Sequence, residues 1–401
     1  MPWSRHRRLW KWLPRVAGLG LAWVLSLALT VLAGQGVALP PNALPLVLVD
    51  QASLPQPLGS DDRLWSRSSD RQALLTAVDH SLAYLRTPEA MAAYQHYPVP
   101  GFSRERVQRS LERFRQIVRT ARSAVAFESA IEQEFAFYQS VGQDGNGTVH
   151  FTGYFEPIYQ ASRVPTAEFR YPLYRLPPDL SQWPQPHPTR EQLEGSNGQG
   201  TSGRLRGLEL VWLRDRLEAY LVQVQGSARL QLSDGSTMAI GYAGRTEYPY
   251  VSIGRELVND GKIPEEGLTL PAVIRYLRQH PDELRTYLLR NNRFIFFKET
   301  TGTPATGSLR VPVTAERSIA TDKSLMPPGA LALIQTDLPE RDTSGGFTLR
   351  PVSRYMLDQD TGGAIRGAGR VDIFMGTGVT AGERAGLINH PGRLYYLLLK
   401  E

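Results

Sequence analysis

The chain has 401 residues, of which 41% are hydrophobic and 21% are charged, close to the average of globular proteins. This composition excludes a disordered chain and a multi-span membrane protein, and the length allows two or three domains. The lack of cysteine excludes disulfides, iron–sulfur clusters, Cys-ligated zinc and thiol nucleophiles. Beyond residue 38 the chain carries 40 basic and 39 acidic groups, so we expect no binding to nucleic acid.

The N-terminal segment has the pattern of an export signal. Basic residues up to Arg15 precede an apolar run over residues 16–33, and small residues at Gly36-Val37-Ala38 offer a cleavage site. We predict that residues 1–38 form an export signal or, if uncleaved, an N-terminal helix that anchors the protein in the membrane. Both alternatives place the remainder in the periplasm or cell envelope. Residues 39–66 are Pro-rich and are predicted to be a linker.

Hydrophobic periodicity predicts helices first and strands afterwards. Apolar residues at helical spacing predict three helices, over 70–86, from Ser103 to about 121, and over 124–141. We interpret the seven arginines of the second helix as a solvated face rather than an anion-binding one. The strands and helices predicted after Gly147 are strands at 148–154, 169–175, 218–225, 228–232, 237–241 and 294–298, and helices at 270–279 and 281–289. From Leu309 onward, short strands with Gly and Pro turns are consistent with a small barrel.

The chemistry points to carboxylates. The histidines lack the spacing of a zinc hydrolase, and neither a G-x-S-x-G motif nor a nucleotide-binding glycine motif occurs. We expect no metal and no cofactor. The segment from Tyr355 to Gly378 combines aspartates with glycines, which let backbone approach a ligand closely. Apolar residues surround Asp372, so its carboxyl should be partly desolvated, with the raised pKa that a general acid needs near neutral pH.

Three other interpretations of this segment compete. Residues 358–363 imitate the start of a calcium loop, but the twelfth position is Gly369 instead of glutamate. The triplet Asp360-Thr-Gly matches aspartic proteases, which need a second such triplet that the chain lacks. A Gly-rich turn with solvated aspartates remains open from the residues alone.

Several blocks in consistent order resemble the MltA family, the membrane-bound lytic murein transglycosylases A. The resemblance covers roughly residues 70–401 and includes the three-aspartate (3D) domain that closes the family's chains. The blocks that carry it are Thr152-Gly-Tyr-Phe-Glu-Pro157, Arg170-Tyr-Pro-Leu-Tyr-Arg-Leu-Pro-Pro178, Val224-Gln-Gly-Ser227, Tyr242-Ala-Gly244, Tyr250-Val-Ser-Ile-Gly254, Asn292-Arg-Phe-Ile-Phe-Phe-Lys298, Ala320-Thr-Asp322, Asp360-Thr-Gly-Gly-Ala-Ile-Arg-Gly367, Arg384-Ala-Gly386 and Asn389-His-Pro-Gly-Arg393.

The resemblance implies a mainly β fold with N-terminal helices. A double-psi β-barrel domain is expected over residues 67–154 plus 293–401. A second, mostly β domain is expected as an insertion over residues 155–292, with a groove between the two domains. Family members often carry a lipid-bearing cysteine after the signal, and this chain has none.

The resemblance also implies cleavage of the β-1,4 bond between N-acetylmuramic acid and N-acetylglucosamine in peptidoglycan, leaving 1,6-anhydromuramic acid ends. The family's catalytic acid maps onto Asp372, with Asp360 and Asp322 as its companions. The partner is the peptidoglycan glycan strand, and we expect a monomer. The residues expected to bind substrate are Thr152, Gly153, Tyr154, Gln225, Gly226, Ser227, Gly362, Gly363 and Ala364. The alternatives are a hydrolase that uses two carboxylates and a non-catalytic cell-wall binding protein.

Overall fold

The structure is a computed structural model. It describes residues 44–50, 58–66, 68–195, 197–200, 203–300 and 305–401. The export signal or anchor predicted over residues 1–38 lies outside these ranges. Within them, no helix combines the length and the hydropathy that crossing a membrane requires.

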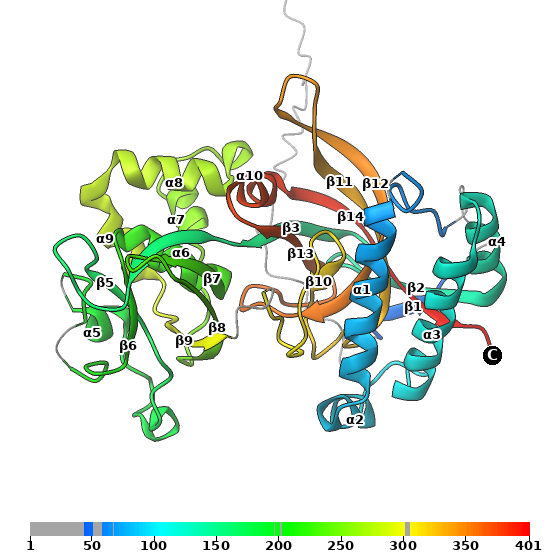
Figure 1. The fold of residues 1–401 in the computed structure, drawn as a ribbon, viewed down its shortest axis with the longest axis horizontal. Coiled ribbons are helices and arrows are strands. Elements are labelled where there is room, and N and C mark those ends of the chain that lie inside the picture. Colours follow the sequence, from blue (N-terminus) through cyan, green and yellow to red (C-terminus); the bar gives the residue numbers. More distant parts are fainter. Residues whose placement is uncertain (1–43, 51–57, 67, 196, 201–202, 301–304) are drawn as a thin grey trace, which may run out of the picture. The chain divides into compact units, whose positions relative to one another are not determined.

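Six strands close into a barrel, in the order β14-β11-β12-β10-β13-β3, because β3 also pairs with β14 (Figure 1). The β10–β12 and β13–β3 pairs are parallel and the other pairs are antiparallel. This closure confirms the predicted barrel. Its strands are β3 (Val149–Glu156), β10 (Ser318–Ala320), β11 (Leu331–Arg341), β12 (Phe347–Asp360), β13 (Arg370–Thr377) and β14 (Asn389–Leu399).

The C-terminal part differs from the prediction of short strands alone. Strands β11, β12 and β14 are 11, 14 and 11 residues long, and helix α10 (Val379–Leu387) lies between β13 and β14. Helix α10 packs directly on β3, since a Cβ added to Gly153 would lie 2.8 Å from Cα of Ala385. The frequent glycines that suggested turns therefore include positions where a helix approaches the barrel closely.

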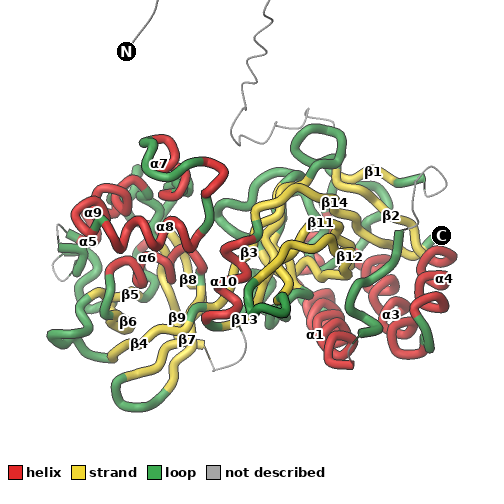
Figure 2. The backbone as a smooth tube through the Cα atoms, turned by 90° about the horizontal axis from the view of Figure 1, so that it is seen from above, coloured by secondary structure: helices red, strands yellow, loops and turns green. Residues whose placement is uncertain are grey.

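Helices α1 (Ser68–Leu85), α2 (Pro88–Gln95), α3 (Arg104–Thr120) and α4 (Ala124–Glu134) precede the barrel strands. Helix α1 packs against β12 and α3 against β14, as Figure 2 shows from above. Ser103 caps α3, as predicted, by accepting the N–H of Arg106 at 3.2 Å.

The predicted helix over 124–141 is wrong beyond Glu134. The chain continues as β2 (Phe135–Ser140), in which Phe135 and Phe137 are buried. Strand β2 pairs with β14 and extends the sheet beyond the barrel. Its aromatic residues suit either a helix or a strand, and pairing with the C-terminal strand, which no local pattern shows, decides between them.

The predicted linker over 39–66 also needs correction where the structure describes it. Strand β1 (Leu46–Leu48) pairs with β2 as an edge strand. Leu58 and Leu64 are buried, and the buried carboxylate of Asp61 forms an ion pair with Arg317 at 2.6 Å. Pro45 is tolerated here because it lies directly before this edge strand.

A second sheet has the strand order β5-β6-β4-β7-β8-β9 (Figure 2). Strand β9 pairs with β8, so the second sheet continues past residue 292, where the sequence prediction ended the inserted domain. The strands are β4 (Ile158–Ser162), β5 (Tyr171–Tyr174), β6 (Glu209–Leu213), β7 (Ser227–Leu232), β8 (Thr237–Arg245) and β9 (Ile295–Thr300). The helices between them are η2 (Leu180–Gln182), α5 (Arg190–Glu194), α6 (Arg216–Gln225), α7 (Ile253–Asn259), η3 (Glu265–Gly267), α8 (Leu270–Gln279) and α9 (Pro281–Arg290).

Residues 218–225, predicted to be a strand, form most of helix α6. Asp215 caps this helix by accepting the N–H of Leu217 at 2.6 Å, and Gly226 ends it in the left-handed conformation, at φ 79°. Val222 packs on the second sheet, and Leu221 packs toward α7, α8 and α9. The apolar residues read as a strand because this short helix is buried on more than one side.

Candidate active site

Asp372 lies in the wall of the barrel, near the start of β13. In the strand register, it pairs with Thr152 on β3 and with Ala320 on β10, and Ala320 in turn pairs with Asp360 at the end of β12. Thr152 also pairs with Asn389 on β14. One row across five strands therefore holds both aspartates, with the methyl group of Ala320 between them.

The carboxyl group of Asp372 is half-buried and has few polar partners. Thr152 Oγ1 donates a hydrogen bond to its Oδ1 at 2.9 Å. The neighbouring side chains of Val371, Ile373 and Phe374 are buried. Burial raises the pKa of Asp372 to about 6, although the Arg370 charge and the Thr152 hydrogen bond act to lower it. This carboxyl is therefore suited to donate a proton near neutral pH, as the sequence predicted.

Asp360 is held by three donors. Tyr154 donates its hydroxyl to Oδ2 at 2.8 Å, and the backbone N–H groups of Ser308 and Thr361 donate to Oδ1, each at 2.8 Å. Burial raises the pKa of Asp360, and these hydrogen bonds act to lower it. The Asp360 charge in turn acts to raise the pKa of Asp372. The predicted pair thus shares one site, with Asp360 immobilised at its edge.

Asp322 has a different set of contacts. Its Oδ2 accepts the N–H of Gly367 at 2.9 Å, and its Oδ1 accepts the hydroxyl of Ser324 at 2.7 Å. Burial acts to raise the pKa of Asp322, but these hydrogen bonds and the Arg366 charge outweigh it and lower the pKa. The ionised carboxylate holds the loop between β12 and β13. Asp322 lies two residues after Ala320 in the chain, outside the row that contains Asp372 and Asp360.

The predicted substrate-binding residues fall into three groups. Thr152 and Tyr154 contact the two aspartates, and Gly153 between them makes room for α10. Gln225 ends α6, and its Oε1 accepts the N–H of Phe155 at 3.1 Å, which joins the second sheet's helix to β3. The remaining residues lie between α6 and β7, namely Gly226 at the end of the helix and Ser227 at the start of the strand, and just after β12, namely Gly362, Gly363 and Ala364.

Residues that the sequence prediction missed complete the surroundings of the aspartates. Arg370 lies two residues before Asp372 on the same strand face, a position that the period of two in β-strands could have identified. Lys323 pairs with the fully buried carboxylate of Asp358, which Tyr396 also contacts at 2.7 Å. Lys323 also donates to the backbone carbonyl of Asp360. No local pattern places Lys323 there, because a long-range fold contact brings it to β12.

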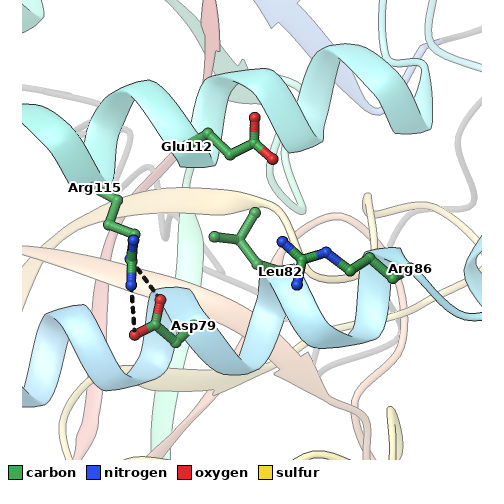
Figure 3. Close-up of a pocket in the computed structure, with 5 residues that line it drawn as sticks. All are labelled: Asp79, Leu82, Arg86, Glu112 and Arg115. Carbon is green, nitrogen blue, oxygen red and sulfur yellow. Dashed lines mark hydrogen bonds and ion pairs between the residues drawn. The ribbon is translucent and has the colours of Figure 1, made fainter.

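A surface pocket between α1 and α3 is separate from this row of residues (Figure 3). Its volume is about 420 Å³, and an ion pair between Arg115 and Asp79 at 2.6 Å spans one side of it. Arg113 on the same helix pairs with Glu134 at 2.6 Å. These pairs support the interpretation of a solvated face for Arg113 and Arg115, but not for Arg106, which is buried and donates to the Leu399 carbonyl at 2.7 Å.

Within the described ranges, no cluster of three or more His, Asp or Glu side chains is arranged to hold a metal ion. The fold and the site together define a class of protein: a closed barrel with one protonatable carboxyl group in its wall, followed by a second, mostly β sheet.

Comparisons with known proteins narrow this class. The family model described as MltA specific insert domain matches residues 150–298, and the one described as 3D domain matches residues 317–398. Membrane-bound lytic murein transglycosylase A of Escherichia coli is 34% identical over 263 residues, which cover 65% of this chain and 68% of that protein. The protein of the same name from Vibrio cholerae is 32% identical over the same shares. The chain belongs to the MltA family.

Solved structures agree with this assignment. The crystal structure of E. coli MltA with bound chitohexaose matches with a TM-score of 0.68 and 27% identity, covering 89% of this chain and 95% of that one. A membrane-bound lytic murein transglycosylase from Agrobacterium tumefaciens matches with a TM-score of 0.67 and 26% identity, covering 89% and 98%. The predicted fold class, a barrel with N-terminal helices and a second β module, is thus confirmed.

Proposed function

We propose that this protein is a lytic transglycosylase that cleaves the β-1,4 bond between N-acetylmuramic acid and N-acetylglucosamine in peptidoglycan. The observation that carries the proposal is the half-buried carboxyl of Asp372, whose pKa of about 6 leaves a proton available near neutral pH. Family membership and the chitohexaose bound to the E. coli structure support a glycan substrate.

Asp372 acts twice in the proposed reaction. Its proton passes to the glycosidic oxygen as the bond to the muramic acid C-1 breaks and positive charge develops on the sugar. The resulting carboxylate then accepts the proton of the C-6 hydroxyl, whose oxygen bonds to C-1. The products are an N-acetylglucosamine end and a 1,6-anhydro ring, Asp372 is again protonated, and no water is consumed.

One carboxyl is sufficient because the nucleophile belongs to the substrate. Well-oriented intramolecular groups reach effective molarities of about 10⁵ M or more. Asp360 is poorly placed to be a second reactive group, because three donors already occupy it. We propose that Asp360 and Asp322 position the site, Asp360 beside the acid and Asp322 through the loop that precedes β13.

We further propose that the substrate contacts the exposed faces of Thr152, Tyr154 and Gln225, together with the backbone after β12. The barrel domain would comprise residues 67–154 and the C-terminal segment. We extend the inserted domain from 155 to Thr300, because β9 belongs to the second sheet. The protein would act as an exported monomer in the cell envelope, attached to the membrane by residues 16–33 if the signal remains.

Mass spectrometry of the fragments released from purified sacculi tests the reaction type. We expect muropeptides with 1,6-anhydro ends, each lighter by one water than the hydrolysis product. Reducing ends in their place would establish a hydrolase, and binding without release would establish a cell-wall binding protein. An Asp372→Asn sample run alongside excludes cleavage by a contaminating enzyme.

A further inference from the structure

Three arginines lie within electrostatic range of one another near the loop that follows β12, and we call Arg245, Arg293 and Arg366 the arginine cluster. The β8–β9 register places Arg245 opposite Ile295, and the pairing continues with a hydrogen bond from the Thr246 N–H to the Phe294 carbonyl at 3.0 Å. Arg293 is therefore the diagonal neighbour of Arg245 on the same face, with about 7–8 Å between the two Cα atoms.

Arg293 is directed at the backbone that the sequence predicts to bind substrate. A Cβ added to Gly363 would lie 1.7 Å from Arg293 Nη1, so the guanidinium packs directly on this glycine. Arg293 is only 7% exposed, and its Nε donates to the Tyr248 carbonyl at 2.9 Å. Its two Nη nitrogens have no hydrogen-bond or ion-pair partner among the described residues, and they are not fully shielded from solvent.

Charge balance in the cluster is incomplete. Burial lowers the pKa of Arg293, and the charges of Arg245 and Arg366 lower it further. Among the described residues, Arg366 is the one member of the cluster with an ion pair, to Asp322 at 3.8 Å, and that carboxylate is already bonded to Ser324 and Gly367. Glu247, opposite Arg293 in the continued register, is exposed and forms no ion pair with it. A buried cation without a counter-charge is costly, which favours an anionic ligand.

The charges of Asp372 and of Arg293 both act on the pKa of Tyr250, which burial raises. The acid and the cluster therefore both lie within electrostatic range of the Tyr250 hydroxyl. Guanidinium groups match carboxylates with paired, charge-assisted hydrogen bonds. Peptidoglycan carries carboxylates on its peptide stems and, where the stem is removed, on the lactyl group of muramic acid, whereas chitohexaose carries none.

We propose that the arginine cluster binds a carboxylate of the peptidoglycan strand and so selects muramic acid-containing substrate over neutral glycan. This inference rests on the proposed function. Arg245 and Arg293 supply the paired donors, and the Gly363 backbone lets the Arg293 guanidinium approach without a side chain in between.

The test measures dissociation constants in an Asp372→Asn background, which prevents turnover. The three ligands are chitohexaose, glycan strands stripped of peptides by an amidase, and stem-bearing strands. Arg245→Gln and Arg293→Gln should each raise the Kd of a carboxylate-bearing ligand about tenfold or more, as expected for a charged hydrogen bond, and leave chitohexaose within about twofold. The stripped strands identify the lactyl carboxylate as the source, and an effect confined to stem-bearing strands identifies the peptide.

The matched control is Arg350→Gln, because Arg350 is an exposed arginine in the β11–β12 hairpin and is not part of the arginine cluster. If Arg293→Gln does not fold, Arg245→Gln and the charge-retaining Arg245→Lys still decide the question. Unchanged binding of all three ligands, or equal weakening of all three, would overturn the proposal. The mass spectrometry of released fragments tests the proposed function separately. If binding is selective but the fragments have reducing ends, the arginine cluster still binds the carboxylate and the protein is a hydrolase.

Discussion

The barrel contains two groups of shielded carboxylates whose pKa values shift in opposite directions. Burial raises the pKa of Asp372 to about 6, with Arg370 as the main opposing charge. Burial acts in the same direction on Glu316, but Arg384, Arg354 and Arg63 outweigh it and lower the pKa of Glu316 to about 2. The number of cations around the carboxyl group, rather than the depth of burial, decides the direction.

The difference separates the proposed reactive acid from the carboxylates that have a structural role. Glu316 belongs to an ionic cluster that joins strands and the N-terminal segment, in which Arg354 pairs with Glu316 at 2.5 Å and with Asp62 at 2.6 Å. Arg317 pairs with Asp61 nearby, also at 2.6 Å. These ion pairs link β12, the residues just before β10 and the N-terminal segment. Asp372, with one hydroxyl donor and one nearby cation, keeps its proton available for chemistry.

The largest expected effect is on catalysis. Asp372→Asn removes the proton donor, and we expect release of anhydro-muropeptides to fall about 10²- to 10⁴-fold or more. Binding to sacculi should be retained and the melting temperature should not fall, because the amide fills the same space. The exposed Glu383 on α10 provides the matched acid-to-amide control, Glu383→Gln, which should keep wild-type activity. Release at the wild-type rate from Asp372→Asn would show that another group is the acid.

Breaking an ion pair of the ionic cluster should lower the stability of the fold. Arg317→Met leaves the fully buried carboxylate of Asp61 without its cation, and we expect the free energy of unfolding to fall by about 3–5 kcal/mol. Urea titration followed by circular dichroism measures the change, and Arg350→Met is the control on the exposed hairpin. Adding Asp61→Asn should recover part of the loss. Equal stability of Arg317→Met and wild type would mean that the pair contributes little.

The sequence revealed these two regions to very different extents. The row of Thr152, Asp372 and Asp360 was accessible because the residues lie in family-like blocks with strand periodicity. The partners of the ionic cluster are 256 positions apart at Asp61 and Arg317, and nothing local predicts their contact. Tertiary pairing likewise decided the two main errors, β2 after Glu134 and α6 in place of a strand, since short aromatic or aliphatic runs suit both structures.

The opposite shifts predict opposite dependences of stability on pH. Glu316 has a folded pKa of about 2 and an unfolded one of about 4.3, so its contribution is complete above pH 4.3 and is lost as the pH falls toward 2. The shift corresponds to about 3 kcal/mol. Glu316→Gln should be less stable than wild type at pH 6, with the gap closing near pH 2 in equilibrium unfolding.

The contribution of Asp372 to stability depends on pH in the opposite direction. Its raised pKa favours the folded state most below pH 4, and this contribution is lost as the pH rises through about 6. Asp372→Asn should therefore gain stability relative to wild type above pH 6. If both variants shift the pH profile in the same direction, the contrast between the two groups of carboxylates does not hold.

The smallest expected effect tests the hydroxyl that contacts the acid. Thr152 stabilises the ionised form of Asp372 through the 2.9 Å hydrogen bond, so Thr152→Val should raise the pKa of Asp372. The wild-type kcat/KM should fall as the pH rises through about 6, and this limb should move up by about one pH unit in the variant. Thr152→Ser keeps the hydroxyl and should leave the limb in place.

The direction of this shift identifies which atom carries the proton. A limb that moves up means that Thr152 donates to the carboxylate, as the geometry has it. A limb that moves down would mean that the neutral acid donates to Thr152 instead, and that the hydroxyl favours the protonated form. Asp372 would then owe its proton to a hydrogen bond as well as to burial, and the contrast with Glu316 would rest on more than the surrounding cations.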